Sequence, residues 1–503
     1  MSTVGISDKD VSSSRRNVLE ELDHRVPTSF YWSLTLLATI GGFLFGYDTA
    51  NIGSALPFIP YSAAVHPGLA QGYLVGGASL GAAAGALCAG FISDRLGRKS
   101  LLIVDAAIYA GGAILSAVTP NLTVLLVART LIGLAIGADS AIATAYIAEY
   151  APRGRRGALS ILQQWMITVG ILAAFIIALI ILRVAPGSAK GADWRLILGL
   201  GAVPAIIGVI FRTRMPESPR WLIRHGHYEA TQKALAKLGS DVSVEDVEFT
   251  ARELRRADDR SEQSRRRGWS PGVKRALLVV CLFFVFQQIS GINVPLYYGP
   301  KLLGPLFQSG SSTVASTVAG VEVTAIIAAV NVIATYFAFR WIDRIGRRKL
   351  AMGGYGGMIV AAVIAAIGLL AMSGNPKIVV VMIGLCMFVA SFAIGVGGTG
   401  WLIQGESFPT AVRGQAASLA ATADWGANYV LVLAFPVWES GIGLGWVMVC
   451  FAVIALIAIG FVYRFLPETK NHSVEEVTEL FERQAAGEPA RASATRDADA
   501  ATA

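Results

Sequence analysis

The sequence is poor in charge for its length. Only 15% of its 503 residues are charged, whereas 54% are hydrophobic, and the mean hydropathy is +0.57. A chain this apolar cannot be solvated on every side, so its expected solvent is largely lipid. Arg and Lys gather in short clusters between uncharged stretches such as 278–289 and 358–372. The net charge of +8 could suggest a nucleic-acid partner, but charges confined to short clusters between apolar stretches are typical of a protein in a lipid bilayer.

Residues that could carry metal, redox or covalent chemistry are also scarce. The four cysteines all lie in apolar stretches, without a CxxC pair or a nearby histidine cluster: Cys88, Cys281, Cys386 and Cys450. We interpret them as small buried side chains. No nucleophile with a neighbouring base and no phosphate-binding Gly loop is evident, so we expect neither an enzyme nor a cofactor. Residues 1–29 lack the order of a cleaved signal, so the first membrane helix is expected to direct insertion.

Apolar windows of membrane-spanning length recur along the chain. A helix needs about 20 apolar residues to cross the hydrocarbon core. Such spans occur at 30–55, 70–92, 100–119, 122–148, 157–182, 194–212, 274–300, 315–341, 350–372, 376–405, 412–438 and 442–465. We therefore predict an all-α membrane protein with twelve transmembrane helices. Lys and Arg cluster in alternate connections between the spans, which predicts that those connections and both termini face the cytoplasm. The expected location is the cell (plasma) membrane.

The connections divide the chain into segments of different character. We predict two six-helix bundles, at 30–214 and 274–466, joined by a cytoplasmic helical linker at 215–273. A cytoplasmic N-terminal segment (1–29) precedes them and a cytoplasmic tail (467–503) follows. The linker carries apolar residues at helical spacing, including Leu235, Leu238 and Val242, and the tail begins with another amphipathic stretch at 473–483. The charged, Ala-rich remainder of the tail is expected to be disordered.

Two loop motifs each occur twice. GFISDRLGRK at 90–99 is echoed by DRIGRRK at 343–349, and EYAP at 149–152 by ESFP at 406–409. This repetition implies two related halves. Acids and bases at fixed offsets can pair across helix ends and close one side, although a purely topogenic role is the alternative. The residues of this predicted gate are Asp94, Arg98, Glu149, Arg156, Asp343, Arg347, Glu406 and Arg413.

Further motifs lie between residues 35 and 475: GYD at 46–48, Arg129 with Gly133, PESPRWL at 216–222, QQ at 287–288 with GIN at 291–293, and PETK at 467–470. Together with the repeat, they resemble the sugar porter family of the major facilitator superfamily. The resemblance implies two pseudo-symmetric bundles that rock about a central site, and a bacterial-type sugar/proton symporter.

Side-chain amides within the predicted helices are candidates for binding an uncharged polyhydroxylated solute, because each offers donors and an acceptor. They are Gln164, Gln287, Gln288, Asn293, Asn331 and Asn428. For an isolated amide, a contact between helices is the alternative. Around residues 287–293 a ligand is favoured, because Ser290 and Gly291 can loosen the helix and Pro295 can kink it. The resemblance implies that these amides contact sugar.

Aromatic residues can cover the apolar faces of a sugar. Trp401 and Trp425 lie inside predicted spans, and the resemblance implies pocket positions for both. Phe45, Tyr297 and Tyr298 are predicted walls or gates.

An acid and a base also fall inside predicted spans. Asp48 and Arg129 would destabilise the membrane-spanning helices unless they pair, and charged residues inside such helices are expected to have a functional role. Protonation of Asp48 would release Arg129. The resemblance implies that an acid at this position marks proton-coupled members and an amide marks passive facilitators, so we predict proton symport. A purely structural pair is the alternative.

The sequence departs from the family at several positions. Asp424 stands where an amide usually precedes the pocket tryptophan, and could accept sugar hydroxyls, carry a second proton or favour an amino-bearing solute. Asp139 is an uncommon membrane acid, and Ile171 replaces an amide found in some relatives. These departures favour a pentose, polyol, inositol or less usual solute over a plain hexose.

The expected ligands are thus a sugar or polyol and a proton, bound by a monomer. The alternative functions are a passive sugar facilitator, a transporter-like sensor that binds sugar without net flux, and a sugar-modifying membrane enzyme.

Overall fold

The computed structural model describes residues 18, 29–60, 69–150, 156–237, 239–266, 269–307, 312–409, 412–470, 472 and 474–487. Within these ranges all regular secondary structure is helical, and ten helices are long and apolar enough to cross a membrane. One of them, α21 (Arg413–Phe465), contains two spans that meet at Gly443 (φ +78°), and the first span is divided into α3 (Ser29–Ala38) and α4 (Ile40–Ala55). With these two cases the twelve predicted spans are accounted for.

The first half contains the helices from α3 to α10. After α3 and α4 come α5 (Leu69–Leu96), α6 (Arg98–Val118), α7 (Leu122–Tyr150), α8 (Arg156–Val184), α9 (Trp194–Gly199) and α10 (Ala202–Arg212). Helix α5 packs closely on α7, where a Cβ on Gly133 would lie 1.9 Å from Ala78 O and one on Gly137 would lie 2.0 Å from Ala82 O. Only glycine allows two helix backbones to approach this closely.

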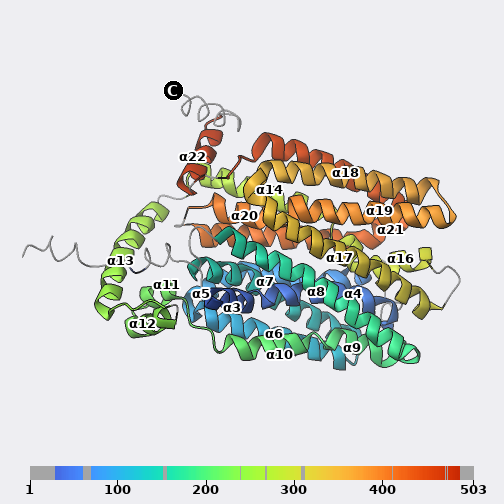
Figure 1. Cartoon of the computed structure of the whole chain (residues 1–503), viewed down its shortest axis with the longest axis horizontal. Coiled ribbons are helices and arrows are strands. Elements are labelled where there is room, and N and C mark those ends of the chain that lie inside the picture. Colours follow the sequence, from blue (N-terminus) through green and yellow to red (C-terminus); the bar gives the residue numbers. More distant parts are fainter. Residues whose placement is uncertain are drawn as a thin grey trace, which may run out of the picture.

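The second half runs from α14 to α21. It contains α14 (Pro271–Ile289), α15 (Val294–Tyr297), α16 (Gly299–Phe307), α17 (Thr313–Ile345), α18 (Arg347–Ala371), α19 (Gly374–Phe392), the π-helix η6 (Ala393–Gly397), α20 (Gly398–Ser407) and α21. The seventh span breaks as expected: α14 ends at Ile289, and Gly291 adopts φ +92°. Figure 1 shows the two halves side by side, the first from blue to green and the second from yellow to red.

The linker helices and the tail helix lie at the same end of the molecule (Figure 1), which we call the linker face. They are α11 (Pro219–Arg224), α12 (Tyr228–Lys237), α13 (Val244–Arg266) and α22 (Val474–Ala485). Leu235 and Val242 are buried in a cluster with Tyr146 and Met215, which docks the linker onto the first half. Leu238 and the tail after residue 487 lie outside the described residues, as does most of the predicted N-terminal segment.

On the other end, the opposite face, the two halves touch. A Cβ on Gly53 of α4 would lie 2.5 Å from Tyr297 O of α15, so the two backbones are in close contact. Arg183 of α8 forms an ion pair with Glu322 of α17. The halves are therefore held together on this side.

Candidate functional site

A cavity separates the two halves on the side nearer the linker face. The empty space between its walls is about 430 Å³, a volume that includes space open to solvent. Its wall is formed by Gly41, Gly42, Phe45, Ile136, Ser140, Thr144, Gln163, Gln164, Ile167, Trp401 and Trp425. Thr144 and Gln163 lie within two turns of the linker-face ends of α7 and α8. None of the described lining residues is charged, which suits a neutral solute.

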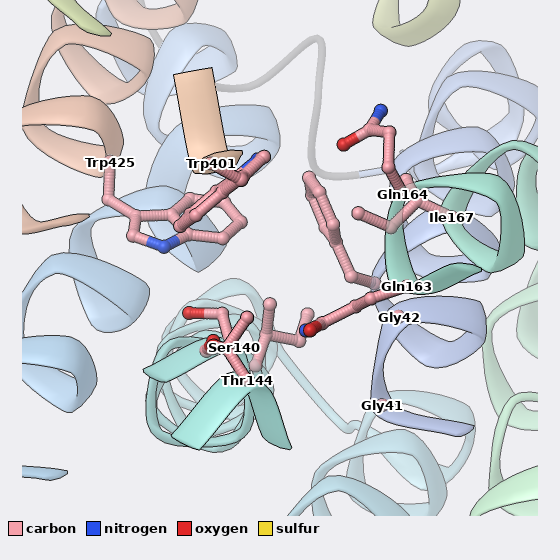
Figure 2. A pocket seen from close by; sticks show the side chains of 11 residues that line it. Gly41, Gly42, Ser140, Thr144, Gln163, Gln164, Ile167, Trp401 and Trp425 are labelled. Atoms are coloured by element: carbon pink, nitrogen blue, oxygen red, sulfur yellow. The ribbon is translucent and has the colours of Figure 1, made fainter. Parts of the chain in front are cut away.

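The two tryptophans form the second half's share of the wall. Figure 2 shows Trp401 and Trp425 on one side of the cavity, with Gln163 and Gln164 of α8 on the other. Phe45 meets Trp425 edge to face, with ring centroids 4.7 Å apart. Trp425 is buried and its Nε1 has no hydrogen-bond partner in the described structure. A buried indole N–H without an acceptor is a group that a ligand oxygen can satisfy.

Four of the predicted substrate-binding residues form one hydrogen-bonded chain. Gln288 Nε2 donates to Asp424 Oδ1 (2.7 Å), while Asn293 Nδ2 donates to Gln288 Oε1 (2.8 Å) and to Asn428 Oδ1 (3.1 Å). Asn428 Nδ2 in turn donates to Ser79 Oγ of α5 (3.0 Å), so the chain crosses from the second half to the first. We call these five residues the amide chain.

The amide chain lies next to the cavity, because Asp424 directly precedes Trp425 on α21. Asn428 lies three residues beyond Trp425, which places it about one turn, or roughly 5 Å, further toward the opposite face. Within the described part of the chain, its members are not among the residues that line the cavity. Their donors and acceptors are instead engaged with one another.

The other two predicted amides behave differently. Gln287 donates from Nε2 to Val396 O (3.1 Å) and Gly397 O (3.0 Å) of the π-helix η6. This is the contact between helices that was the alternative to ligand binding, made possible because a π-turn leaves carbonyls free. Asn331 is buried on α17 and belongs, among the described residues, to neither the cavity wall nor the amide chain.

Asp48 of α4 and Arg129 of α7 form a buried ion pair, in which Arg129 Nη1 donates to Asp48 Oδ1. Arg129 is 0% exposed, and its Nε and Nη2 have no partner in the described structure. Asp48 is thus the one described anion that the guanidinium contacts. Protonation of Asp48 would leave a buried cation without a counter-ion, which is strongly unfavourable.

The gate motif of the first half binds its own helices together. Arg98 contacts Glu149 (Nε to Oε1, 3.2 Å) and Asp94 (Nη2 to Oδ1, 2.9 Å). Glu217, which follows the sixth span, accepts from the backbone N of Arg98 (3.0 Å). Arg156 was also predicted here, but its side chain lies outside the described structure.

The second half repeats this geometry. Arg347 Nη2 contacts Glu406 Oε1 (2.8 Å) and Asp343 Oδ1 (3.1 Å), and Glu468, after the twelfth span, accepts from Arg347 N (2.8 Å). Arg413 Nε donates to Phe408 O (3.0 Å) of its own loop. Each of these described contacts stays within one half. The pairs join the ends of neighbouring helices, as the sequence predicts, and their role in closing this side stays a prediction.

The two tyrosines predicted as a gate pack against other helices. Tyr297 and Tyr298 are buried at the end of α15, and Tyr298 Oη donates to Val432 O (2.8 Å) of α21 while its ring packs on Phe435. The backbone of Tyr297 also lies against Gly53 of α4, so this segment contacts both halves.

Several site residues were not predicted. Gln163, Ser140 and Thr144 line the cavity, and Glu217 and Glu468 complete the ion-pair networks. Signals were available: Ser140 and Thr144 share one helix face at i, i+4, and both glutamates follow a proline in a repeated PE motif.

Comparison with known proteins places this architecture. The family profile described as "Sugar (and other) transporter" matches residues 34–481. The chain is 34% identical over 452 residues to the glucose transporter GlcP of Staphylococcus epidermidis, covering 90% of this chain and 97% of that protein. It is 32% identical to the arabinose-proton symporter of Bacillus subtilis, covering 93% and 99%.

A solved structure has the same overall shape. The proton:xylose symporter XylE, bound to 6-bromo-6-deoxy-D-glucose, matches with a TM-score of 0.75 and 27% sequence identity, over 90% of this chain and 99% of that chain. XylE is a member of the major facilitator superfamily.

Proposed function

This chain belongs to the sugar (and other) transporter family, and we propose that it moves a monosaccharide or polyol together with a proton by alternating access. It is a multi-pass membrane transporter and not an enzyme. The single observation that carries the proposal is the buried pair of Asp48 and Arg129.

The pair couples a proton to a change of shape. With Asp48 ionised, α4 and α7 are bound to each other through a buried ion pair. With Asp48 protonated, Arg129 has to find another acceptor or water, so the relative free energies of the two conformations change. A proton bound on one side of the membrane and released on the other then drives solute in the same direction.

The solute is neutral and rich in hydroxyl groups. The cavity wall offers the rings of Trp401 and Trp425 for apolar faces and the amides of Gln163 and Gln164 for hydroxyls. The amide chain extends the site beyond Trp425, where its hydrogen bonds exchange for bonds to the solute. Asp424 adds an acceptor that favours solutes with strong donors, including amino groups.

We assign the linker face to the cytoplasm of the cell membrane, because the Arg-rich loops gather there. The cavity near that face and the packed tyrosines of the predicted gate then correspond to an inward-facing state. In this proposal residues 30–214 and 274–466 are the two moving halves, both termini are cytoplasmic, and one chain transports on its own.

The decisive experiment compares Asp48→Asn with the unaltered protein in proteoliposomes. An imposed proton gradient should concentrate radiolabelled sugar with the unaltered protein and not with Asp48→Asn, whereas exchange of sugar at equal concentrations should survive in both. Asp241→Asn is the matched control, because Asp241 is exposed between α12 and α13. Accumulation by Asp48→Asn at the unaltered level would overturn the coupling role.

The same vesicles separate the rival functions. A passive facilitator would equilibrate sugar but never concentrate it, and a sensor would bind sugar without flux. Mass analysis of the internal solute would reveal any chemical modification.

A further inference from the structure

A second buried acid-base cluster lies in the first half, apart from Asp48 and Arg129. Arg212, at the end of α10, contacts Asp105 of α6 (Nη1 to Oδ1, 2.7 Å) and Asp139 of α7 (Nη2 to Oδ2, 2.6 Å). The three residues are 0%, 2% and 3% exposed, respectively. One guanidinium therefore holds two carboxylates out of contact with solvent.

All the donor nitrogens of Arg212 are already engaged. Nη1 also donates to Leu102 O (2.5 Å), Nη2 to Ala38 O (3.3 Å), and Nε to Leu37 O (3.5 Å). The guanidinium has no spare group for a further acceptor. Yet one oxygen of each acid, Asp105 Oδ2 and Asp139 Oδ1, is buried without a hydrogen-bond partner in the described structure.

The cluster thus contains two acidic side chains and one basic side chain. Two ionised carboxylates beside one guanidinium leave a net negative charge in a dry site, and like charges this close cannot both ionise without penalty. A single proton removes both defects, because it cancels the excess charge and turns one unpaired acceptor oxygen into a donor. The other groups nearby are engaged elsewhere: Tyr109 Oη donates to Leu44 O, and Asp48 is held by Arg129.

The cluster also borders the transport cavity. Gly41 lines the cavity, and a Cβ placed on Gly41 would lie 1.8 Å from Asp139 Oδ1. Ser140, which follows Asp139, lines the cavity as well. The unpaired oxygen of Asp139 therefore lies against a glycine that lines the cavity.

We propose that Asp105 and Asp139, oriented by Arg212, form a second proton-binding site that holds one dissociable proton and exchanges it with water in the cavity. Asp139 is the acid nearer the cavity, so the proton enters and leaves there by transfer between a carboxyl oxygen and water. The site is separate from the Asp48 and Arg129 pair. Its occupancy can be measured without any transport, so this proposal and the coupling role of Asp48 can fail independently.

Infrared spectroscopy of the purified protein in lipid tests the site, because the C=O stretch of a protonated carboxyl is resolved from the bands of a carboxylate. Asp105→Asn and Asp139→Asn should each lose one protonated carboxyl per chain at neutral pH, since either change leaves one carboxylate opposite one guanidinium. Asp48→Asn is the control and should keep this band. Arg212→Gln should gain a second protonated carboxyl, because both acids then lack a base.

The result that would overturn the proposal is a carboxyl band that persists unchanged in both Asn variants. Thermal unfolding adds a second criterion. Asparagine copies the shape of a protonated acid, so each single Asn variant should unfold at or above the temperature of the unaltered protein. A marked fall in both would mean that both negative charges are required, and would equally refute a shared proton.

Discussion

Asp424 sets this transporter's site apart at the scale of single residues. It is buried, and its described partner is the amide of Gln288 and not a cation. A buried amide N–H left without an acceptor costs roughly 1–3 kcal/mol, so Gln288 needs the carboxyl oxygen of Asp424 as its partner. Asp424 therefore fixes the orientation of Gln288, whose Oε1 is left to accept from Asn293. The direction of hydrogen bonding along the amide chain follows from this one carboxylate.

We predict that Asp424→Asn changes selectivity between solutes more than it changes overall affinity. Loss of the carboxylate removes about 1.4 kcal/mol from a charged amino donor relative to a hydroxyl, or roughly tenfold. The ratio of the Kd for an amino sugar to the Kd for its neutral parent should rise by that factor in equilibrium binding. Ser79→Ala, at the other end of the amide chain, is the control that should weaken both solutes alike. An unchanged ratio in Asp424→Asn would contradict a role in selectivity.

At the level of residues, the sequence predicted the pairing of charged side chains that lie inside apolar spans. Asp48 and Arg129 both fall inside apolar spans, so each had to find a countercharge. Asp139 was recognised as unusual, but its partner was not, because Arg212 ends its span and looks like an ordinary topogenic charge. Only the packing of α6, α7 and α10 brings the three charges together.

At the scale of helices, function depends on where the regular structure breaks. The seventh span stops at Ile289 and resumes at Val294, which lets Asn293 reach both Gln288 and Asn428. The Ser-Gly pair and proline made this break predictable. The π-helix η6 had no comparable signal, since its extra residue is stabilised by tertiary contacts such as those from Gln287.

We predict that Gly291→Ala destabilises the protein by at least about 2 kcal/mol. Gly291 adopts φ +92°, and a Cβ there would lie 2.4 Å from the ring of Phe451, so strain and a clash combine. Gly353→Ala is the matched control, because Gly353 lies inside α18 with nothing within 4 Å of a new Cβ. Thermal unfolding in detergent should show a clear fall for the first variant and none for the second. Equal unfolding temperatures would show that the break does not need glycine.

At the scale of the whole molecule, the internal repeat predicted more than the helix count. The PE motifs bring Glu217 and Glu468 to equivalent places beside Arg98 and Arg347. Both halves therefore have the same hydrogen bond from a backbone N–H to a glutamate on the linker face. The twelve spans and the two halves followed from hydropathy and repetition. The conformational state did not, because one sequence has to support both an inward-facing and an outward-facing arrangement with a small difference in free energy.

The pair of Arg183 and Glu322 gives a way to shift that balance, because it joins the halves on the opposite face. Both side chains are well exposed, so the pair contributes at most about 1 kcal/mol, or a factor of about five in population.

Arg183→Glu should open this face and lower the population of the inward-facing state. With Thr144→Cys in the cavity wall and the native cysteines replaced by serine, labelling by a thiol reagent added on the linker face should slow by about twofold to fivefold. The swapped variant Arg183→Glu with Glu322→Arg restores the opposite charges and should recover the original rate. If the single reversal labels as fast as its parent, the halves do not depend on this contact, and the closed face must be held by the tyrosine gate and helix packing alone.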